Sequence, residues 1–97
     1  MAVAVLQELP EMVTVEMYDA VGKEMGDAAA SAPGNIIHTG GVTPSGVIRV
    51  YDVWESVEDW ERFRDNVLGP AVQKVSGGQP PGEPRTEVYE LHDVQQP

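Results

Sequence analysis

The stretch that decides the fold is GVIRVYDVWESVEDWERF, residues 46–63. Its first ten residues are rich in β-branched and aromatic side chains, a composition that predicts a strand. Ser56 follows, with the acidic Asp59 three positions later, which is the pattern of a helix N-cap. Trp60 and Phe63 then begin an apolar face at helical spacing. The stretch therefore predicts a buried strand that leads directly into an amphipathic helix.

A first helix is expected upstream of this stretch. Thr14 stands at an N-cap position, and Tyr18 follows on the apolar stripe that we expect to be buried. Downstream, Gly69-Pro70 is expected to bend or break the second helix, with residues 71–75 adding a further turn.

Four segments have the composition of strands, and two Gly/Pro-rich passages have the composition of loops, residues 28–34 and 76–84. The strands are expected over residues 2–9, 36–41, 46–55 and 86–94. The resulting order, β-α-β-β-α-β, predicts a ferredoxin-like α+β domain in which two helices cover one face of a four-stranded antiparallel sheet. Apolar side chains on the other face need a cover as well, so we expect a homodimer.

Composition limits the classes of function. The chain has 97 residues, which fits one domain over residues 1–97. A formal net charge of -10 argues against nucleic acid and anionic membrane surfaces as partners, because both require clustered Lys and Arg. We find no run long enough to span a bilayer and no signal peptide, so the cytoplasm is the expected compartment. The chain has no Cys, and its two His and scattered acids form no metal-ligand pattern, so no metal is expected.

The segment VYDVWES, residues 50–56, followed by Trp60 and Phe63, resembles the dimeric α+β barrel superfamily. More narrowly, it is similar to the antibiotic-biosynthesis-monooxygenase type, in which the third strand commonly ends in Trp-x-Ser at the entry to the second helix. Here Trp54-Glu55-Ser56 has that pattern. The resemblance spans residues 2–94 and implies a homodimeric barrel. The superfamily includes quinone-forming monooxygenases, heme degraders and cyclases.

The resemblance carries over to individual residues only in part. The cofactor-free quinone-forming members have an Asn four residues before the Trp and a Tyr six residues after it. These positions hold Val50 and Trp60 here, so the aromatic side chain is retained while the polar group is lost. The heme degraders need a His on the second helix, and neither His38 nor His92 is expected there. The resemblance therefore implies an activity without a cofactor.

Asp52 is the first candidate catalytic residue. It shares a face with Val50 and Trp54, because side chains alternate along a strand. A carboxylate held in apolar surroundings beneath the helices takes up a proton readily, so Asp52 could act as a general base on an acidic phenol. The alternatives are exposure at a sheet edge, or an ion pair with one of the nearby arginines, Arg49, Arg62 or Arg64.

His38 is the second candidate, and its partner depends on the hairpin through residues 43–46. A two-residue Pro-Ser turn would pair His38 with Tyr51, whereas a loop one residue longer would pair it with Asp52 as a dyad. A slip of one residue turns every side chain to the opposite face, so the sequence leaves both registers open. His92 is expected on the last strand, where it would contact substrate or form hydrogen bonds at an interface.

Ligand contacts are expected at the seam between the sheet and the helices. The side chains that would contact a substrate there are apolar or aromatic: Trp54, Trp60, Phe63 and Val50. Tyr18 is a third candidate catalytic residue, because its hydroxyl could reach a substrate oxygen from the first helix. The alternative for Tyr18 and the two tryptophans is ordinary core packing.

The leading hypothesis is a small cofactor-independent enzyme of the monooxygenase or cyclase type that acts on an aromatic, polyketide-like small molecule. Asp52 or His38 would abstract a proton, since a resonance-stabilised phenolate needs only deprotonation and an apolar cavity. The alternative is a non-catalytic dimeric ligand-binding or accessory protein, which the loss of the Asn at Val50 favours. A third hypothesis is a structural dimer whose aromatic side chains fill the seam.

Overall fold

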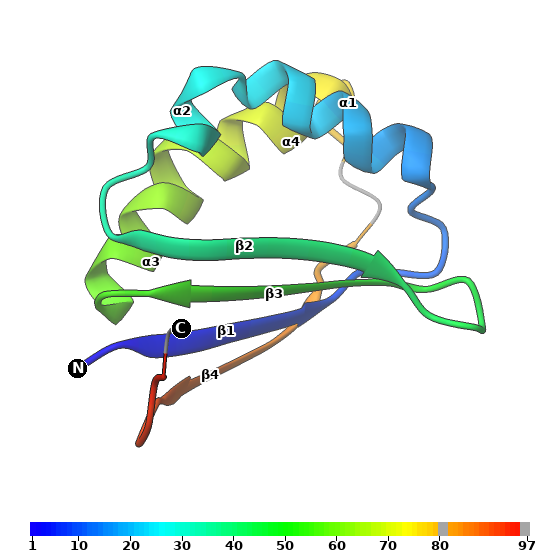
Figure 1. Cartoon of the computed structure of the whole chain (residues 1–97). Coiled ribbons are helices and arrows are strands. Elements are labelled where there is room, and N and C mark those ends of the chain that lie inside the picture. The colour runs from blue at the N-terminus through cyan, green and yellow to red at the C-terminus, as the bar shows by residue number, and fades with distance from the viewer. Residues whose placement is uncertain (80–81, 96–97) are drawn as a thin grey trace.

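The computed structural model describes residues 1–79 and 82–95, so part of the expected loop over residues 76–84 lies outside the described residues. Its elements follow one another in a ferredoxin-like order (Figure 1). They are β1 Val3–Glu8, α1 Val15–Met25, α2 Asp27–Ala30, β2 Asn35–Val42, β3 Ile48–Trp54, α3 Val57–Phe63, the π-helical turn η1 Arg64–Leu68, α4 Gly69–Val75 and β4 Arg85–Glu90.

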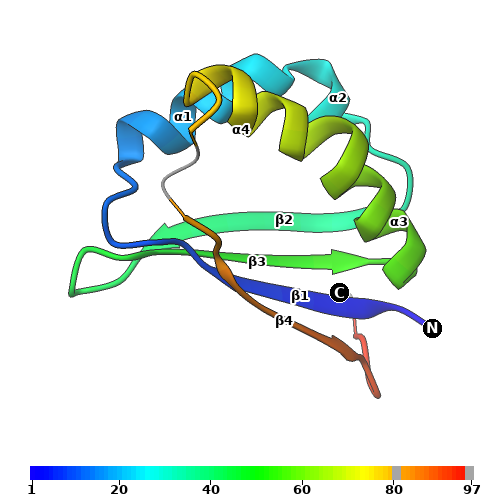
Figure 2. The same ribbon diagram turned by 180° about the vertical axis from the view of Figure 1, so that it is seen from behind.

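The four strands form one antiparallel sheet in the order β2-β3-β1-β4. The helices all lie on the same side of this sheet, and the opposite side is open (Figures 1 and 2). The predicted α+β fold class is therefore confirmed. We call the two sides of the sheet the covered face and the open face.

Both predicted N-caps are confirmed. The Thr14 side chain accepts a hydrogen bond from the Met17 backbone N–H at 3.1 Å, and the Ser56 hydroxyl accepts one from the Asp59 N–H at 3.2 Å. The passage over residues 28–34, predicted to be a loop, begins as the short helix α2.

The predicted break at Gly69-Pro70 is not found, and residues 71–75 continue the helix as predicted. The backbone stays helical through Gly69, and the preceding turn widens to the π form, in which the Gly69 N–H donates to the Arg64 carbonyl. The wider turn accommodates Pro70, which lacks an N–H of its own. A Cβ on Gly69 would lie 3.0 Å from the Arg64 carbonyl oxygen, so glycine permits this close approach.

The last strand is shorter than the predicted span of residues 86–94, because β4 ends at Glu90. The Leu91 N–H still donates to the Ala2 carbonyl at 2.9 Å, next to the start of β1. Because β1 starts at Val3, which pairs with Glu90, the ladder between the two strands ends here.

The hydrophobic core lies between the covered face and the helices. Its buried cluster comprises Val3, Val5, Ala32, Trp54 and Trp60. Val3 stands opposite Trp54, and Val5 stands opposite Asp52 in the register of β1 and β3. The covered face of the two central strands is therefore apolar except at a few positions, and those positions define the site.

Candidate active site

The hairpin between β2 and β3 settles the position of His38. The Thr43 N–H donates to the Val47 carbonyl at 2.8 Å, so residues 44–46 form the tip of the loop. Gly46 has a φ of 88°, a left-handed conformation that glycine adopts at low cost. This is the longer of the two predicted loops, and it pairs His38 with Asp52.

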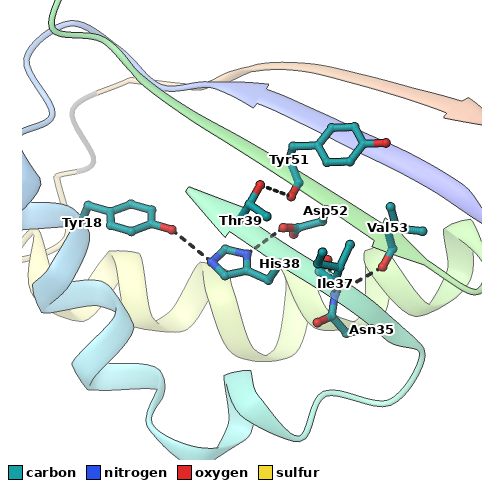
Figure 3. A network of polar contacts seen from close by, with 8 residues as sticks. All are labelled: Tyr18, Asn35, Ile37, His38, Thr39, Tyr51, Asp52 and Val53. Carbon is teal, nitrogen blue, oxygen red and sulfur yellow. Dashed lines mark hydrogen bonds and ion pairs between the residues drawn. The ribbon is translucent and has the colours of Figure 1, made fainter. Parts of the chain in front are cut away.

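A chain of hydrogen bonds links Tyr18, His38 and Asp52 (Figure 3). His38 Nδ1 lies 2.7 Å from Asp52 Oδ1, and His38 Nε2 lies 3.0 Å from the Tyr18 hydroxyl. The Asp52 carboxylate only accepts hydrogen bonds, so neutral His38 carries its proton on Nδ1 and its Nε2 accepts a hydrogen bond from the Tyr18 hydroxyl. The structure thus brings together the three residues that the sequence singles out as candidate catalytic groups.

The three groups differ in their contact with solvent. The Asp52 side chain is 5% exposed, whereas the His38 side chain is 53% exposed. The hydrogen bond to Asp52 raises the pKa of His38 above its ordinary value, and partial burial acts against this rise. Burial and the nearby negative charge of Asp52 raise the pKa of the Tyr18 hydroxyl, so this group stays protonated and able to donate.

The arginine alternatives for Asp52 are wrong, because each arginine pairs with another carboxylate. The side chain of Arg49 contacts Glu8 at 3.0 Å, that of Arg62 contacts Asp59 at 3.0 Å, and that of Arg64 contacts Asp65 at 2.8 Å. His38 is therefore the partner of Asp52. Alternative placement at an exposed sheet edge is wrong as well, since Asp52 lies on the inner strand β3.

Gly40 provides the space that Tyr18 occupies on the covered face. A Cβ on Gly40 would overlap the Tyr18 hydroxyl and would lie 2.9 Å from its Cζ. A Cβ on the next residue, Gly41, would meet nothing within 4 Å. The Tyr18 ring therefore passes close to the β2 backbone at Gly40 and so reaches His38.

A cavity of about 1240 Å³ lies between the covered face and the helices, and Tyr18, His38 and Asp52 line it. Four predicted ligand-contact residues line it as well: Val50, Trp54, Trp60 and Phe63. The volume exceeds that of a drug-sized ligand, and most of the lining side chains are apolar. The cavity can therefore hold an aromatic molecule against the hydrogen-bonded chain.

The two tryptophans belong mainly to the core. Trp54 is 1% exposed and Trp60 is 2% exposed, and their ring centroids are 6.0 Å apart in a tilted arrangement. Phe63 is half-buried, and its ring centroid lies 5.2 Å from that of Trp54. The broad faces of both indoles are thus covered by protein, so the ring left to offer surface to a ligand is that of Phe63. The buried Nε1–H of Trp54 has no hydrogen-bond partner among the described residues.

One buried polar residue was missed by the sequence analysis. Gln7 on β1 is 7% exposed, and its amide Nε2 donates to Thr86 Oγ1 at 3.3 Å. Both residues line the cavity. The sequence signal for this burial is the position of Gln7 along the strand. Its side chain lies on the same face of β1 as those of Val3 and Val5, which are both buried.

His92 does not join the site. The prediction that it lies on the last strand is wrong, because β4 ends at Glu90 and His92 follows in an exposed bend. It is not among the residues that line the cavity.

Two further findings concern residues 1–79 and 82–95. They contain no group of three or more His, Cys, Asp or Glu side chains placed to hold a metal ion. None of the helices they form is long and apolar enough to cross a membrane.

Comparison with known proteins gives matches in structure but not in sequence. No protein-family model matches the chain, and no curated protein sequence matches it. Rv0793 from Mycobacterium tuberculosis has a similar structure, with a TM-score of 0.74, 14% identity, and coverage of 99% of this chain and 100% of that chain. SnoaB from Streptomyces nogalater, a cofactor-independent oxygenase, has a TM-score of 0.71 at 11% identity over 96% and 95% of the two chains.

A third similar structure is a monooxygenase from the gene ActVA-Orf6 of Streptomyces coelicolor in complex with Nanaomycin D. It has a TM-score of 0.65 at 18% identity, over 99% of this chain and 91% of that chain. A protein of unknown function from Nitrosomonas europaea is also similar, with a TM-score of 0.69. At these identities the likeness concerns the fold. The chain has the fold of the antibiotic-biosynthesis-monooxygenase-like proteins, which confirms the resemblance found in its sequence.

Proposed function

We propose that this protein is a cofactor-independent monooxygenase that acts on a small aromatic phenol in the cavity between the sheet and the helices. The observation that carries this proposal is the chain Tyr18–His38–Asp52, in which a buried carboxylate orients an imidazole at the wall of a largely apolar cavity. Similar folds support the reaction class, since SnoaB is a cofactor-independent oxygenase and the ActVA-Orf6 monooxygenase binds Nanaomycin D.

The first step is removal of the phenolic proton. The substrate hydroxyl donates to the Tyr18 oxygen while the Tyr18 proton moves to His38 Nε2, 3.0 Å away. Asp52 accepts the Nδ1–H at 2.7 Å and stabilises the imidazolium that forms. Because half of the His38 side chain is exposed, the proton then passes to solvent.

The second step is oxidation of the phenolate by molecular oxygen. The phenolate gives one electron to O2, and the resulting superoxide and phenoxyl radical combine at a ring carbon that carries hydrogen. That hydrogen leaves as a proton while the O–O bond breaks, so that one oxygen atom stays in the quinone. The other departs as hydroxide, which takes up a proton and is released as water. The largely apolar cavity favours this step, because it keeps the reactive intermediate away from bulk water.

Turnover and binding measured on the same variants test this proposal. We expect quinone formation with one O2 consumed per phenol, followed by absorbance and with an oxygen electrode over a panel of polycyclic phenols. Asp52→Asn and His38→Gln should each lower turnover by about 100-fold to 10,000-fold, because both remove the oriented base. Binding, followed by quenching of tryptophan fluorescence, should stay within about threefold of wild type. Glu8→Gln, which changes a carboxylate on the open face, is the matched control.

Two results would contradict the proposal. One is wild-type turnover in both variants, which would remove His38 and Asp52 from the chemistry. The other is tight phenol binding with no reaction in the wild type, which would make the protein a ligand-binding module. Product formation without O2 uptake would instead assign the same proton abstraction to a cyclisation.

We also propose that two copies of the chain pair through the open face. Its exposed apolar side chains support this pairing, since Ile37 is 48% exposed, Tyr51 is 36% exposed and Tyr89 is 44% exposed. All three lie on the face opposite Asp52 in the strand registers. Sedimentation should give the mass of a dimer, and a monomer at micromolar concentration would exclude this arrangement.

A further inference from the structure

Gln7 is a buried polar side chain for which the proposed reaction gives no role. It stands on β1, an inner strand, directly opposite Val50 on one side and Thr86 on the other. Its neighbours Val5 and Val50 are 0% and 6% exposed, so the amide lies within an apolar wall. The amide lines the same cavity as His38.

Strand pairing does not account for this amide. The backbone ladder already joins β1 to β4 along the whole of Val3–Glu8. Among the described residues, the side chain makes one hydrogen bond, from Nε2 to Thr86 Oγ1, at the long distance of 3.3 Å. A primary amide has two N–H donors and a carbonyl acceptor, so one donor and the acceptor remain for another molecule.

The amide lies at the opposite side of the cavity from the base. His38 and Gln7 are two strands apart and one side-chain row apart on the covered face. With strands about 4.8 Å apart and a rise of about 3.4 Å per residue, their Cα atoms are separated by about 12 Å. A fused aromatic skeleton that carries an oxygen at each end can reach both groups.

We propose that the Gln7 amide is a second polar anchor of this cavity, which binds a hydroxyl or carbonyl oxygen at the far end of a fused aromatic ligand whose other oxygen faces Tyr18 and His38. The inference rests on the proposed function for the placement of the first oxygen. It assigns Gln7 to specificity, since the amide would select ligands that carry oxygen at both ends.

The test compares two probes that differ only in the far oxygen, 2-hydroxyanthracene and 2,6-dihydroxyanthracene. Wild-type protein should bind the diol about tenfold more tightly by fluorescence titration, the gain from one added hydrogen bond. Gln7→Met keeps the length of the side chain and should remove this preference by weakening the diol alone. Leu6→Met, the same kind of change at the neighbouring β1 residue on the open face and outside the cavity lining, should keep the preference.

The outcomes separate the anchor from the reaction. Equal affinity of the wild type for the two probes overturns the anchor and leaves the proposed reaction unaffected. This measurement uses only the wild-type protein, so it does not depend on whether a variant folds. Equal weakening of both probes in Gln7→Met, or an unchanged diol preference in that variant, overturns it as well. Failure of the wild type to bind either probe overturns both the anchor and the proposed function.

Discussion

The covered face and the open face of the sheet use the same strands but treat polar side chains in opposite ways. On the covered face, Asp52 is buried and paired with His38, and it belongs to a chain that reaches Tyr18 on α1. On the open face, Glu8 contacts Arg49 at 3.0 Å and Arg85 at 3.7 Å in an exposed cluster. A buried carboxylate needs a partner with good geometry, whereas an exposed one is already solvated.

This difference shows that the candidate catalytic side chains lie on the covered face. Alternation along β3 turns Asp52 and Trp54 to the helices, while Arg49 and Tyr51 turn away from them. The covered face therefore combines core and candidate active site. The open face is left to charge pairing and to the proposed contact with a second chain.

The largest effect on stability is expected for Trp54→Ala, which should lower the free energy of unfolding by about 3–5 kcal/mol. Trp54 is 1% exposed and contacts the rings of Trp60 and Phe63, so its removal leaves a cavity in the core. Tyr51→Ala on the open face is the matched aromatic truncation. Its effect on urea unfolding should grow with protein concentration, because the contact it removes is between chains. A concentration-independent loss of equal size at both positions would abolish the distinction between the faces.

An intermediate effect is expected from a pair of neighbouring glycines. Gly40→Ala should lower phenol turnover by about 10-fold to 100-fold, because the new Cβ displaces the Tyr18 hydroxyl from His38. Gly41→Ala should leave turnover near that of wild type, since its Cβ meets nothing within 4 Å. In a Tyr18→Ala background the effect of Gly40→Ala should disappear. Equal effects of the two alanines in the wild type would show that Tyr18 is not positioned by Gly40.

The smallest effect is expected for the ion pair on the open face. Arg49→Met should change the free energy of unfolding by at most about 1 kcal/mol in urea denaturation, because the Arg49 side chain is 59% exposed and its pairing with Glu8 is screened by salt. The difference should vanish in high salt. A salt-independent loss of several kcal/mol would mean that this pair is as important to the fold as the buried groups are.

Much of the fold was accessible from sequence because its signals are local. The caps at Thr14 and Ser56 and the alternation along β3 are read from neighbouring residues, and all three are confirmed. The end of β4 was not predicted correctly, because it depends on where the partner strand β1 begins. The π-helical turn that precedes Pro70 was not predicted, because such a turn has no distinct sequence signal at this site.

The candidate site was predictable in its residues but not in its assembly. Parity placed Asp52 beneath the helices, while its partner depended on a single residue in the hairpin loop over Thr43–Val47. The contact between Tyr18 and His38 depends on how α1 crosses β2, which no local pattern specifies. Gln7 shares the parity of Val3 and Val5, but it was missed because residues 3–6 are all apolar and do not show which side of the strand faces the helices.

The pH dependence of His38 connects the site to two observable properties. Its raised pKa means that protonated His38 stabilises the fold fully below pH 6.5, and that this contribution is lost as the pH rises through the pKa of the folded state. Turnover should depend on pH in the opposite direction, because only neutral His38 can accept a proton. It should therefore rise as the pH rises through the same pKa.

The most direct test of the central claim, that Asp52 holds His38 with Nε2 free to accept a proton, is a ¹⁵N NMR titration of the His38 ring in wild type and in Asp52→Asn. In the wild type, we expect a pKa above 6.5 and a neutral form protonated at Nδ1. In Asp52→Asn, the pKa should fall and the preference for this tautomer should weaken. A neutral His38 protonated at Nε2 in the wild type, or the same pKa in both proteins, would contradict the account.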